Sequence, residues 1–403
     1  MSQSDLTKGG NIPTGINSVL MCGEKRPNLA GLYSTLRHNA SRMLTAATVA
    51  LGLSALTSCG LVRDDLDPCP EDIKTRFELR FIYDYNMEFA NAFHNQVDCL
   101  SVYFFDGNGE LMYIDYITDP ELLSDEDWRL YPELPDGDYH VVAYGGMDCD
   151  QASFYRTGNF PEGTHFTNLH VQLDPTSLVI PENSRLHNHY YGSLDFTIGG
   201  ENGVTKATVP MMRNTNNIHI ALQNENVSQP IDHNDFIFEI TDDNNDFAHD
   251  NSLIPTGVIT YQPWLKENRS TRPSLSDVTQ EQTAWWDQED VESRADGTDF
   301  HAAVGHFTTS RLMDTYNTGK TTPTTLNIHK ADGTGTVFSI PLVKYMLMFK
   351  NEGAGASTNV MTDQEYLDRE NTWNFVFFIK DGFWVQTHLI INDWEVRMNH
   401  TDF

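Results

Sequence analysis

The stretch that decides the fold runs from Val97 to Ile117 and reads VDCLSVYFFDGNGELMYIDYI. Val97–Phe105 is rich in β-branched and aromatic residues, and Leu111–Ile117 has the same character. Between them, Asp106-Gly107-Asn108-Gly109 supplies residues that tolerate the backbone angles of a tight turn. The stretch therefore predicts a β-hairpin.

A period of two continues on both sides of this hairpin. Arg76–Tyr85 places Phe77, Leu79, Phe81 and Tyr83 on one face. Leu134-Pro135-Asp136-Gly137-Asp138-Tyr139 is a second turn, leading into a strand at 140–144. Further strands are expected at 166–173, 190–198, 204–211, 217–223, 235–241, 257–261, 305–312, 325–328, 336–340, 344–349, 373–380, 384–391 and 394–397. Many short strands separated by turns indicate an all-β protein built of antiparallel β-sandwiches.

Few segments have a helical pattern. We expect short helices at Asn86–Phe93, at Asp119–Arg129 and at Thr362–Glu370, where Thr362 and Glu365 have the spacing of a capping box. Trp264–Asp299 is polar and is predicted to be a long exposed excursion.

The amino-terminal region resembles a lipoprotein signal. Arg37 and Arg42 precede the apolar run Met43–Leu56, and Leu56-Thr57-Ser58-Cys59 is followed by Gly60. The run has the length of a signal-peptide core and is too short to span a bilayer. We expect cleavage before Cys59 and attachment of lipid to that cysteine. The alternative is a buried apolar helix that happens to end in Cys.

Length then divides the chain. Residues 1–58 are expected to be a signal peptide with an extension, and 59–67 a lipidated tether. Residues 68–213 and 214–403 are each long enough to bury a core, so we expect two β-sandwich domains in tandem.

The net charge argues against two classes of partner. The chain carries a formal net charge of −31, and residues 1–58 hold more basic than acidic side chains, so the remainder is more acidic still. Such a chain is repelled by nucleic acid and by anionic lipid head groups.

Three cysteines remain once Cys22 is removed with the signal and Cys59 carries lipid. An odd number permits one intrachain disulfide and one spare thiol. We consider a Cys69–Cys149 disulfide as a hypothesis, with Cys99 left over. No CxxC pair is present, so zinc is not expected.

Catalytic and metal sites are not expected. His187 and His189 are two residues apart, so a strand would place both on one face, as a metal-binding pair requires. No third ligand follows at a spacing typical of a metal site. We therefore favour the alternative that both are surface histidines. Asp242-Asp243-Asn244-Asn245-Asp246 begins like a calcium loop, yet Phe247 and Leu253 replace the required Gly and Glu. The sequence contains no GxSxG, HExxH or P-loop. We therefore predict a protein that is not an enzyme and needs no cofactor.

Several segments together resemble the FimB-type fimbrial anchor lipoproteins of Gram-negative oral and gut bacteria, in order and spacing over about 67–397. These segments are Asp67–Pro70, Phe81–Met87, Val102–Asp106, Leu134–Tyr139, Met212–Ile218, Asp250-Asn251, Tyr261–Pro263, Tyr366–Glu370 and Ile391–Trp394. Arg63-Asp64-Asp65 also looks like the acidic signal that sends such lipoproteins to the outer face of the outer membrane.

The resemblance implies two transthyretin-like β-sandwiches that join fimbrial shaft pilins by strand complementation, in a protein held at the cell outer membrane by lipid. The strand expected at 384–397 is our candidate for coupling to the next subunit. Two alternatives remain. One is a carbohydrate-binding surface lipoprotein of a glycan-uptake system that stacks Trp264, Trp285 and Trp286 on sugar. The other is a glycan hydrolase with an unrecognised carboxylate pair.

Overall fold

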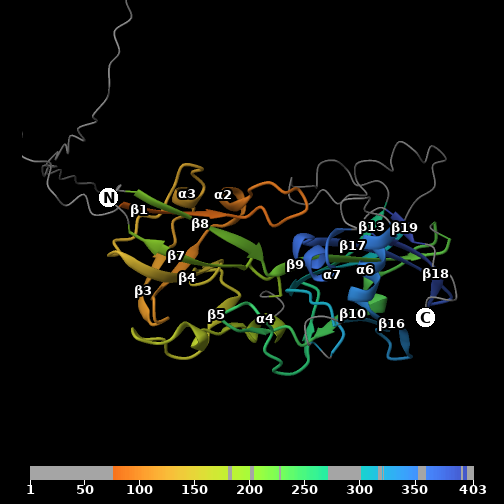
Figure 1. Cartoon of the computed structure of the whole chain (residues 1–403). Helices are drawn as coiled ribbons and strands as arrows, with labels where there is room; N and C mark the ends of the chain where they lie inside the picture. Colours follow the sequence, from red (N-terminus) through yellow and green to blue (C-terminus); the bar gives the residue numbers. More distant parts are fainter. Residues whose placement is uncertain are drawn as a thin grey trace, which may run out of the picture. The chain divides into compact units, whose positions relative to one another are not determined.

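The protein is mostly β, with several sheets and a few short helices (Figure 1). The computed structural model describes residues 76–179, 184–199, 204–226, 228–270, 301–315, 320, 322–352, 360–391 and 394–396. All of these belong to one compact unit, Asp72–Phe403. None of the helices in these ranges is long and apolar enough to cross a membrane.

The first six-stranded sheet contains the predicted hairpin. Leu100 pairs with Ile117 and Phe104 with Tyr113 across it, so the prediction from Val97–Ile117 is confirmed. Figure 1 shows β1, β8, β7 and β4 of this sheet side by side. Its order is β1 (Arg76–Ile82), β8 (Val204–Arg213), β7 (Tyr190–Ile198), β4 (Gly137–Gly145), β2 (Leu100–Asp106) and β3 (Leu111–Ile117).

The second half of the chain forms two more sheets. One has six strands, in the order β13 (Leu265–Ser270), β14 (His301–Ser310), β9 (Thr215–Asn224), β17 (Thr372–Lys380), β18 (Phe383–Ile391) and β19 (Trp394–Val396). The other has four, in the order β12 (Ile259–Tyr261), β10 (Phe236–Asp242), β15 (Thr325–Lys330) and β16 (Thr336–Pro341).

Each six-stranded sheet contains one parallel pair, which the expected antiparallel architecture did not include. β1 runs parallel to β8, and β17 runs parallel to β9. Both pairs join strands that are far apart in sequence, so no hairpin turn forces them to be antiparallel. A period of two shows which face of a strand is buried and says nothing about its direction.

The change of sheet falls where the expected domain junction lies. β8 ends at Arg213 and β9 begins at Thr215. A small sheet nevertheless joins residues from both sides, in the order β11 (Asp246–Phe247), β6 (Val171–Leu173) and β5 (Phe154–Arg156). The largest apolar core likewise includes Phe154 together with Phe375. The division into domains 68–213 and 214–403 therefore stays a prediction.

Two helices lie in the second half of the chain. The helix α7 (Asp363–Arg369) confirms the capping prediction, because the Thr362 hydroxyl accepts a hydrogen bond from the Glu365 N–H at 3.1 Å. The strand expected at 344–349 is wrong: this segment lies in α6 (Leu342–Glu352). Leu342, Tyr345, Met346 and Phe349 are buried at helical spacing, and that period prevails over a strand pattern.

The other two predicted helices are mostly absent because local side chains satisfy the backbone instead. The Asn86 amide donates to the carbonyls of Tyr83 and Ala90, so 86–92 forms turns, and only α2 (Phe93–Gln96) is helical. Asp119 caps α3 (Pro120–Leu123) as expected. The helix ends there, where the Ser124 hydroxyl donates to the carbonyl of Glu121.

The expected exposed excursion at 264–299 is also corrected in part. Leu265–Ser270 is the edge strand β13, paired antiparallel with β14. Trp264 is half-buried and donates its backbone N–H to the His306 carbonyl at 2.9 Å. Trp285 and Trp286 lie outside the described residues.

Candidate assembly edges and the polar junction

The lipidation site expected at Cys59 lies outside the described residues, as do Arg63-Asp64-Asp65 and Cys69. Lipid attachment at Cys59 therefore stays a prediction. The described residues instead show which strands end the sheets and which polar side chains contact one another.

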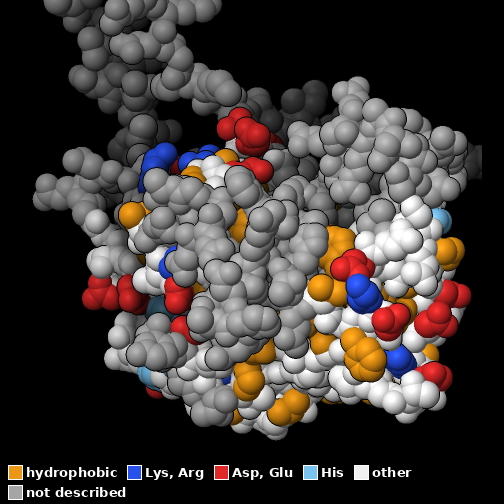
Figure 2. All heavy atoms as spheres, turned by 90° about the vertical axis from the view of Figure 1, so that its right-hand side faces the viewer, with side chains coloured by type: hydrophobic (Ala, Val, Ile, Leu, Met, Phe, Trp, Pro, Cys, Tyr) orange, Lys and Arg blue, Asp and Glu red, His pale blue; other side chains and the backbone are white. Residues whose placement is uncertain are grey.

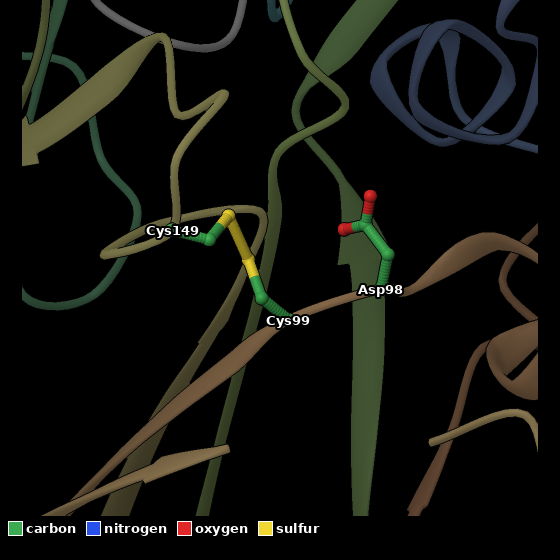
Figure 3. Close-up of side chains that lie close together, drawn as sticks. All are labelled: Asp98, Cys99 and Cys149. Atoms are coloured by element: carbon green, nitrogen blue, oxygen red, sulfur yellow. A yellow bond between two sulfur atoms is a disulfide. The ribbon is translucent and has the colours of Figure 1, made fainter. Parts of the chain in front are cut away.

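The hypothesis of a Cys69–Cys149 disulfide is wrong, because Cys149 has a different partner. Cys149 bonds to Cys99, with the two Cα atoms 6.3 Å apart (Figure 3). Cys99 stands at the start of β2, and hydrogen bonds across β2 and β4 bring the loop after β4, which holds Cys149, next to it. Residue parity alone left three pairings open, and the register of this strand pair selects one.

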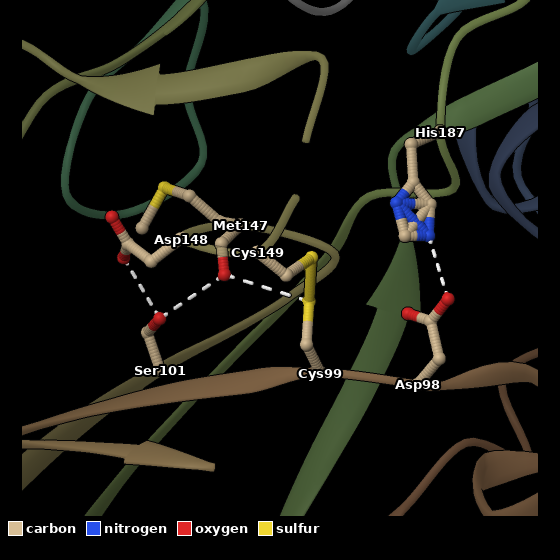
Figure 4. The surroundings of a disulfide bond; sticks show 7 residues. All are labelled: Asp98, Cys99, Ser101, Met147, Asp148, Cys149 and His187. Atoms are coloured by element: carbon tan, nitrogen blue, oxygen red, sulfur yellow. Dashed lines mark hydrogen bonds and ion pairs between the residues drawn. A yellow bond between two sulfur atoms is a disulfide. The ribbon is translucent and has the colours of Figure 1, made fainter. Parts of the chain in front are cut away.

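Hydrogen bonds hold the loop that carries Cys149 (Figure 4). The Ser101 hydroxyl donates to Asp148 Oδ2 at 2.8 Å and to the Met147 carbonyl at 3.3 Å. Asp148 has a positive φ of 60°, an angle that Asp tolerates better than most residues. The disulfide and these bonds together fix the loop between β4 and β5.

Asp98 lies beside the disulfide, and its carboxylate with the two sulfurs forms the one group of metal-type ligands among the described residues. Both sulfurs are used in the S–S bond, so neither is a thiolate that would bind metal. The Asp98 carboxylate instead contacts His187 Nε2 at 2.9 Å (Figure 4).

The two candidate histidines do not form a metal pair. They lie before β7 rather than on a strand. His187 contacts Asp98, whereas His189 is completely buried between Tyr144 and Phe154 and contacts the Asn214 amide. Burial lowers the pKa of His189 to about 3, so the ring is neutral. His189 is therefore a core residue, not the surface histidine that was favoured.

A polar network occupies the point where the chain passes from β8 to β9. The side-chain amides of Asn214 and Asn251 donate to each other's oxygens at 2.7 and 3.0 Å, and both residues are buried. Asn251 has a φ of 63°, in the left-handed region that Asn adopts readily. Its carbonyl accepts from the Arg311 guanidinium at 2.9 Å.

Arg369 at the end of α7 follows Asp368, which forms an ion pair with Arg311, and packs against the residues after β1. Its guanidinium lies 4.1 Å from the ring centre of Tyr85 and 4.6 Å from that of Phe89. It also contacts the Glu365 carboxylate at 2.9 Å. Through these contacts, residues of the segments 81–87, 212–218, 250–251 and 366–370 lie near one another, although they are far apart in sequence.

The Asp-rich segment after β10 is not a calcium loop. Asp242 and Asp243 are buried and face Lys320, and the Asn244 side chain donates to the Arg311 carbonyl at 2.9 Å. The segment thus binds a lysine and a backbone group of its own chain. No pattern in the sequence points to Lys320, which stands 78 residues after Asp242.

The sheet edges are the places where a further strand could be added. In the first sheet, β1 is bridged at Leu79 to Leu130, and β3 is bridged at Leu111 to Gly163 and Thr164. The rest of β3, including the half-exposed Tyr116, stands at the end of the sheet order. In the second six-stranded sheet, β19 stands at the carboxyl-terminal edge.

A hollow of about 700 Å³ in the described surface is lined by Asp150, Ser153, Asp174, Arg185 and His187 among others. Figure 2 shows acidic, basic and hydrophobic side chains interspersed on the described part of the face that it displays.

Comparison with known proteins identifies the family. A model of the family described as fimbrillin-A associated anchor proteins Mfa1 and Mfa2 matches residues 66–400. Among curated proteins, a comparison found no match.

Solved structures agree with this family. A candidate adhesin from Bacteroides thetaiotaomicron is 38% identical, with a TM-score of 0.69 over 83% of this chain and 100% of that one. A candidate polysaccharide-binding protein from the same species is 27% identical, with a TM-score of 0.64 over 81% and 99%. The fimbrial anchor protein Mfa2 from Porphyromonas gingivalis is 15% identical, with a TM-score of 0.55 over 80% and 99%, and so shows the fold alone.

The class defined by these findings is a mostly-β, non-enzymatic fimbrial anchor or adhesin. The chain belongs to the family of fimbrillin-A associated anchor proteins Mfa1 and Mfa2.

Proposed function

We propose that this protein is an outer-membrane lipoprotein that anchors a fimbria at the cell surface. The observation that carries the proposal is the family match, which extends over residues 66–400 and therefore over nearly all of the chain after Cys59. Lipid on Cys59 holds the amino terminus at the outer membrane, and the β-sheet body extends outward from it.

The body consists, in this proposal, of two transthyretin-like sandwiches, and strand addition at an open edge joins it to the shaft pilin. An edge strand offers unpaired N–H and C=O groups, and a partner strand pairs with them while its alternate side chains bury apolar surface. Among the strands that end a sheet in the described part of the chain, we take β19 and β3 as the two candidates. β19 belongs to the carboxyl-terminal segment expected to couple to the next subunit.

Site-specific cross-linking on intact cells tests this proposal. A photoreactive amino acid replaces Glu395 in β19 or Tyr116 in β3, and Thr334, in the exposed turn between β15 and β16, serves as the matched control. Light should link the β19 or β3 variant to a pilin, which mass spectrometry of the product identifies. The control should give no such product. Failure of both edges to capture a pilin, with the variants displayed at normal levels, contradicts strand addition.

Carbohydrate binding is the second candidate, favoured by the relative at 27% identity that is described as a candidate polysaccharide-binding protein. Trp264 is half-buried, and its ring centre lies 4.9 Å from the Arg185 guanidinium. Part of its ring is therefore covered and not open for stacking on a sugar. Binding to a glycan array that Trp285→Ala and Trp286→Ala abolish would support this candidate over the anchor.

A further inference from the structure

A lysine and two aspartates meet in the interior at the end of β10. The side chains of Lys320 and Asp242 are completely buried, and that of Asp243 is 6% exposed. Lys320 Nζ contacts Asp242 Oδ1 and lies 3.1 Å from Asp243 Oδ1. One amine thus faces two carboxyl groups out of reach of solvent.

The Asp242 carboxyl group is held by further donors. The Thr324 hydroxyl donates to Oδ2 at 2.6 Å, and the Asp243 backbone N–H donates to Oδ1 at 2.7 Å. Both oxygens are therefore fixed with respect to the lysine. Donors aimed at a carbonyl oxygen also stabilise the negative charge that develops when a nucleophile attacks its carbon.

Burial makes the charged form of this cluster expensive, because a buried ion pair loses hydration that its mutual attraction does not fully restore. It lowers the pKa of the Lys320 ammonium to about 7, so a neutral amine is accessible at physiological pH. A neutral amine is a nucleophile, whereas an ammonium is not.

We propose that Lys320 and Asp242 condense into an intramolecular isopeptide bond. A proton moves from the Lys320 ammonium to the Asp242 carboxylate, and the neutral Nζ attacks Cγ of the resulting carboxylic acid. A C–N bond forms, a C–O bond of the carboxyl group breaks, and the oxygen leaves as water. The step needs neither an oxidant nor a reductant.

Asp243 is placed to relay the proton in this step. Its carboxylate takes a proton from the attacking nitrogen and delivers it to the departing oxygen, so it ends in the state in which it began. Thr324 keeps its hydrogen bond to the oxygen that remains as the amide carbonyl. The product is a neutral amide, which removes the buried charges of both partners.

The bond would join the end of β10 to the segment before β15. These two strands are neighbours at the centre of the four-stranded sheet, and the linked residues are 78 apart in sequence. A cross-link of this span restricts the unfolded chain strongly. This inference does not depend on the proposed function, since it concerns the interior of the fold.

Intact-mass spectrometry of the purified protein, reduced and alkylated first, tests the proposal directly. We expect a mass lower by one water molecule than that calculated for the same processed and alkylated chain without the bond. Digestion should give a branched peptide containing Asp242 and Lys320, with no tryptic cleavage after Lys320. The full mass, together with cleavage after Lys320, would overturn the proposal.

Variants assign the roles. Lys320→Arg and Asp242→Ala should restore the full mass, and Asp243→Asn should leave most molecules unlinked. Lys350→Arg is the matched control, because Lys350 forms an ion pair at 2.6 Å with Asp363, whose side chain is partly exposed, and its replacement should not affect the water loss. Complete linkage in Asp243→Asn would contradict the proton relay. Since the wild-type mass decides the central point, a variant that fails to fold does not hide the answer.

Discussion

Arg311 and Asp368 form a two-point ion pair: guanidinium Nε and Nη2 donate to Oδ1 and Oδ2 of the carboxylate, each at 2.7 Å. The side chains are 12% and 5% exposed. The pair joins the segment after β14 to α7, and through the Asn251 carbonyl it reaches the loop that meets Asn214. One cation thus connects three segments that lie far apart in sequence.

Breaking this pair should destabilise the protein strongly. Asp368→Asn leaves the Arg311 charge buried without its counter-ion, which costs about 3–5 kcal/mol. Urea unfolding measures the loss as a lower midpoint. The control is Lys380→Gln, which removes an exposed ion pair to Glu225 and should leave the midpoint unchanged. Equal midpoints for Asp368→Asn and the wild type would show that the Arg311–Asp368 pair does not stabilise the fold.

The Cys99–Cys149 disulfide should stabilise the fold by about 2–4 kcal/mol, because it closes a long loop in the unfolded chain. The double variant Cys99→Ser, Cys149→Ser should melt at a lower temperature than the wild type. Dithiothreitol should lower the melting temperature of the wild type but not that of the double variant. Recovery of a Cys69–Cys149 peptide from the non-reduced protein would reject this pairing.

Acid should destabilise the protein partly through His189. Its pKa is about 3 in the fold against an ordinary 6.5, so between these values the unfolded chain binds a proton that the folded chain does not. Stability therefore falls with falling pH, by up to about 1.4 kcal/mol per pH unit for each such group. Burial lowers the pKa of His219 to about 3 as well, with the same sign.

Glu370 acts in the opposite direction. Burial raises its pKa to about 6 from 4.5, so its contribution is lost as the pH rises through that window. The measurement is therefore a comparison: urea midpoints at pH 7, 6 and 5 for the wild type and for His189→Phe. The variant should show a shallower decline, since Glu370 contributes equally to both. Parallel declines would exclude His189 as a source of acid sensitivity.

The sequence predicted the strands better than their arrangement. Alternation and turn residues were enough for the hairpin at 97–117, because both signals are local. The parallel pairing of β1 with β8 could not be predicted from the sequence, because it depends on contacts between segments that are distant along the chain. The helix α6 was mistaken for a strand because a short apolar run fits both periods.

The contacts between polar residues were harder to predict from the sequence than the strands were. The Cys69–Cys149 disulfide was a hypothesis, whereas Cys149 bonds to Cys99, a pairing set by the register of β2 and β4. No sequence pattern marks Lys320, because its environment is set by two aspartates that are distant in sequence and face it in the fold. Polar residues that act together here are brought together by topology and not by spacing.

The most direct test of the anchor account is the location of fimbriae in cells that carry Cys59→Ser. Without the lipid, the protein and the pilin joined to it should be found in the culture medium by immunoblotting, and washed cells should lack both. Cys69→Ser is the control and should retain both on the cells. Pilin that stays on Cys59→Ser cells at the wild-type level would contradict the account.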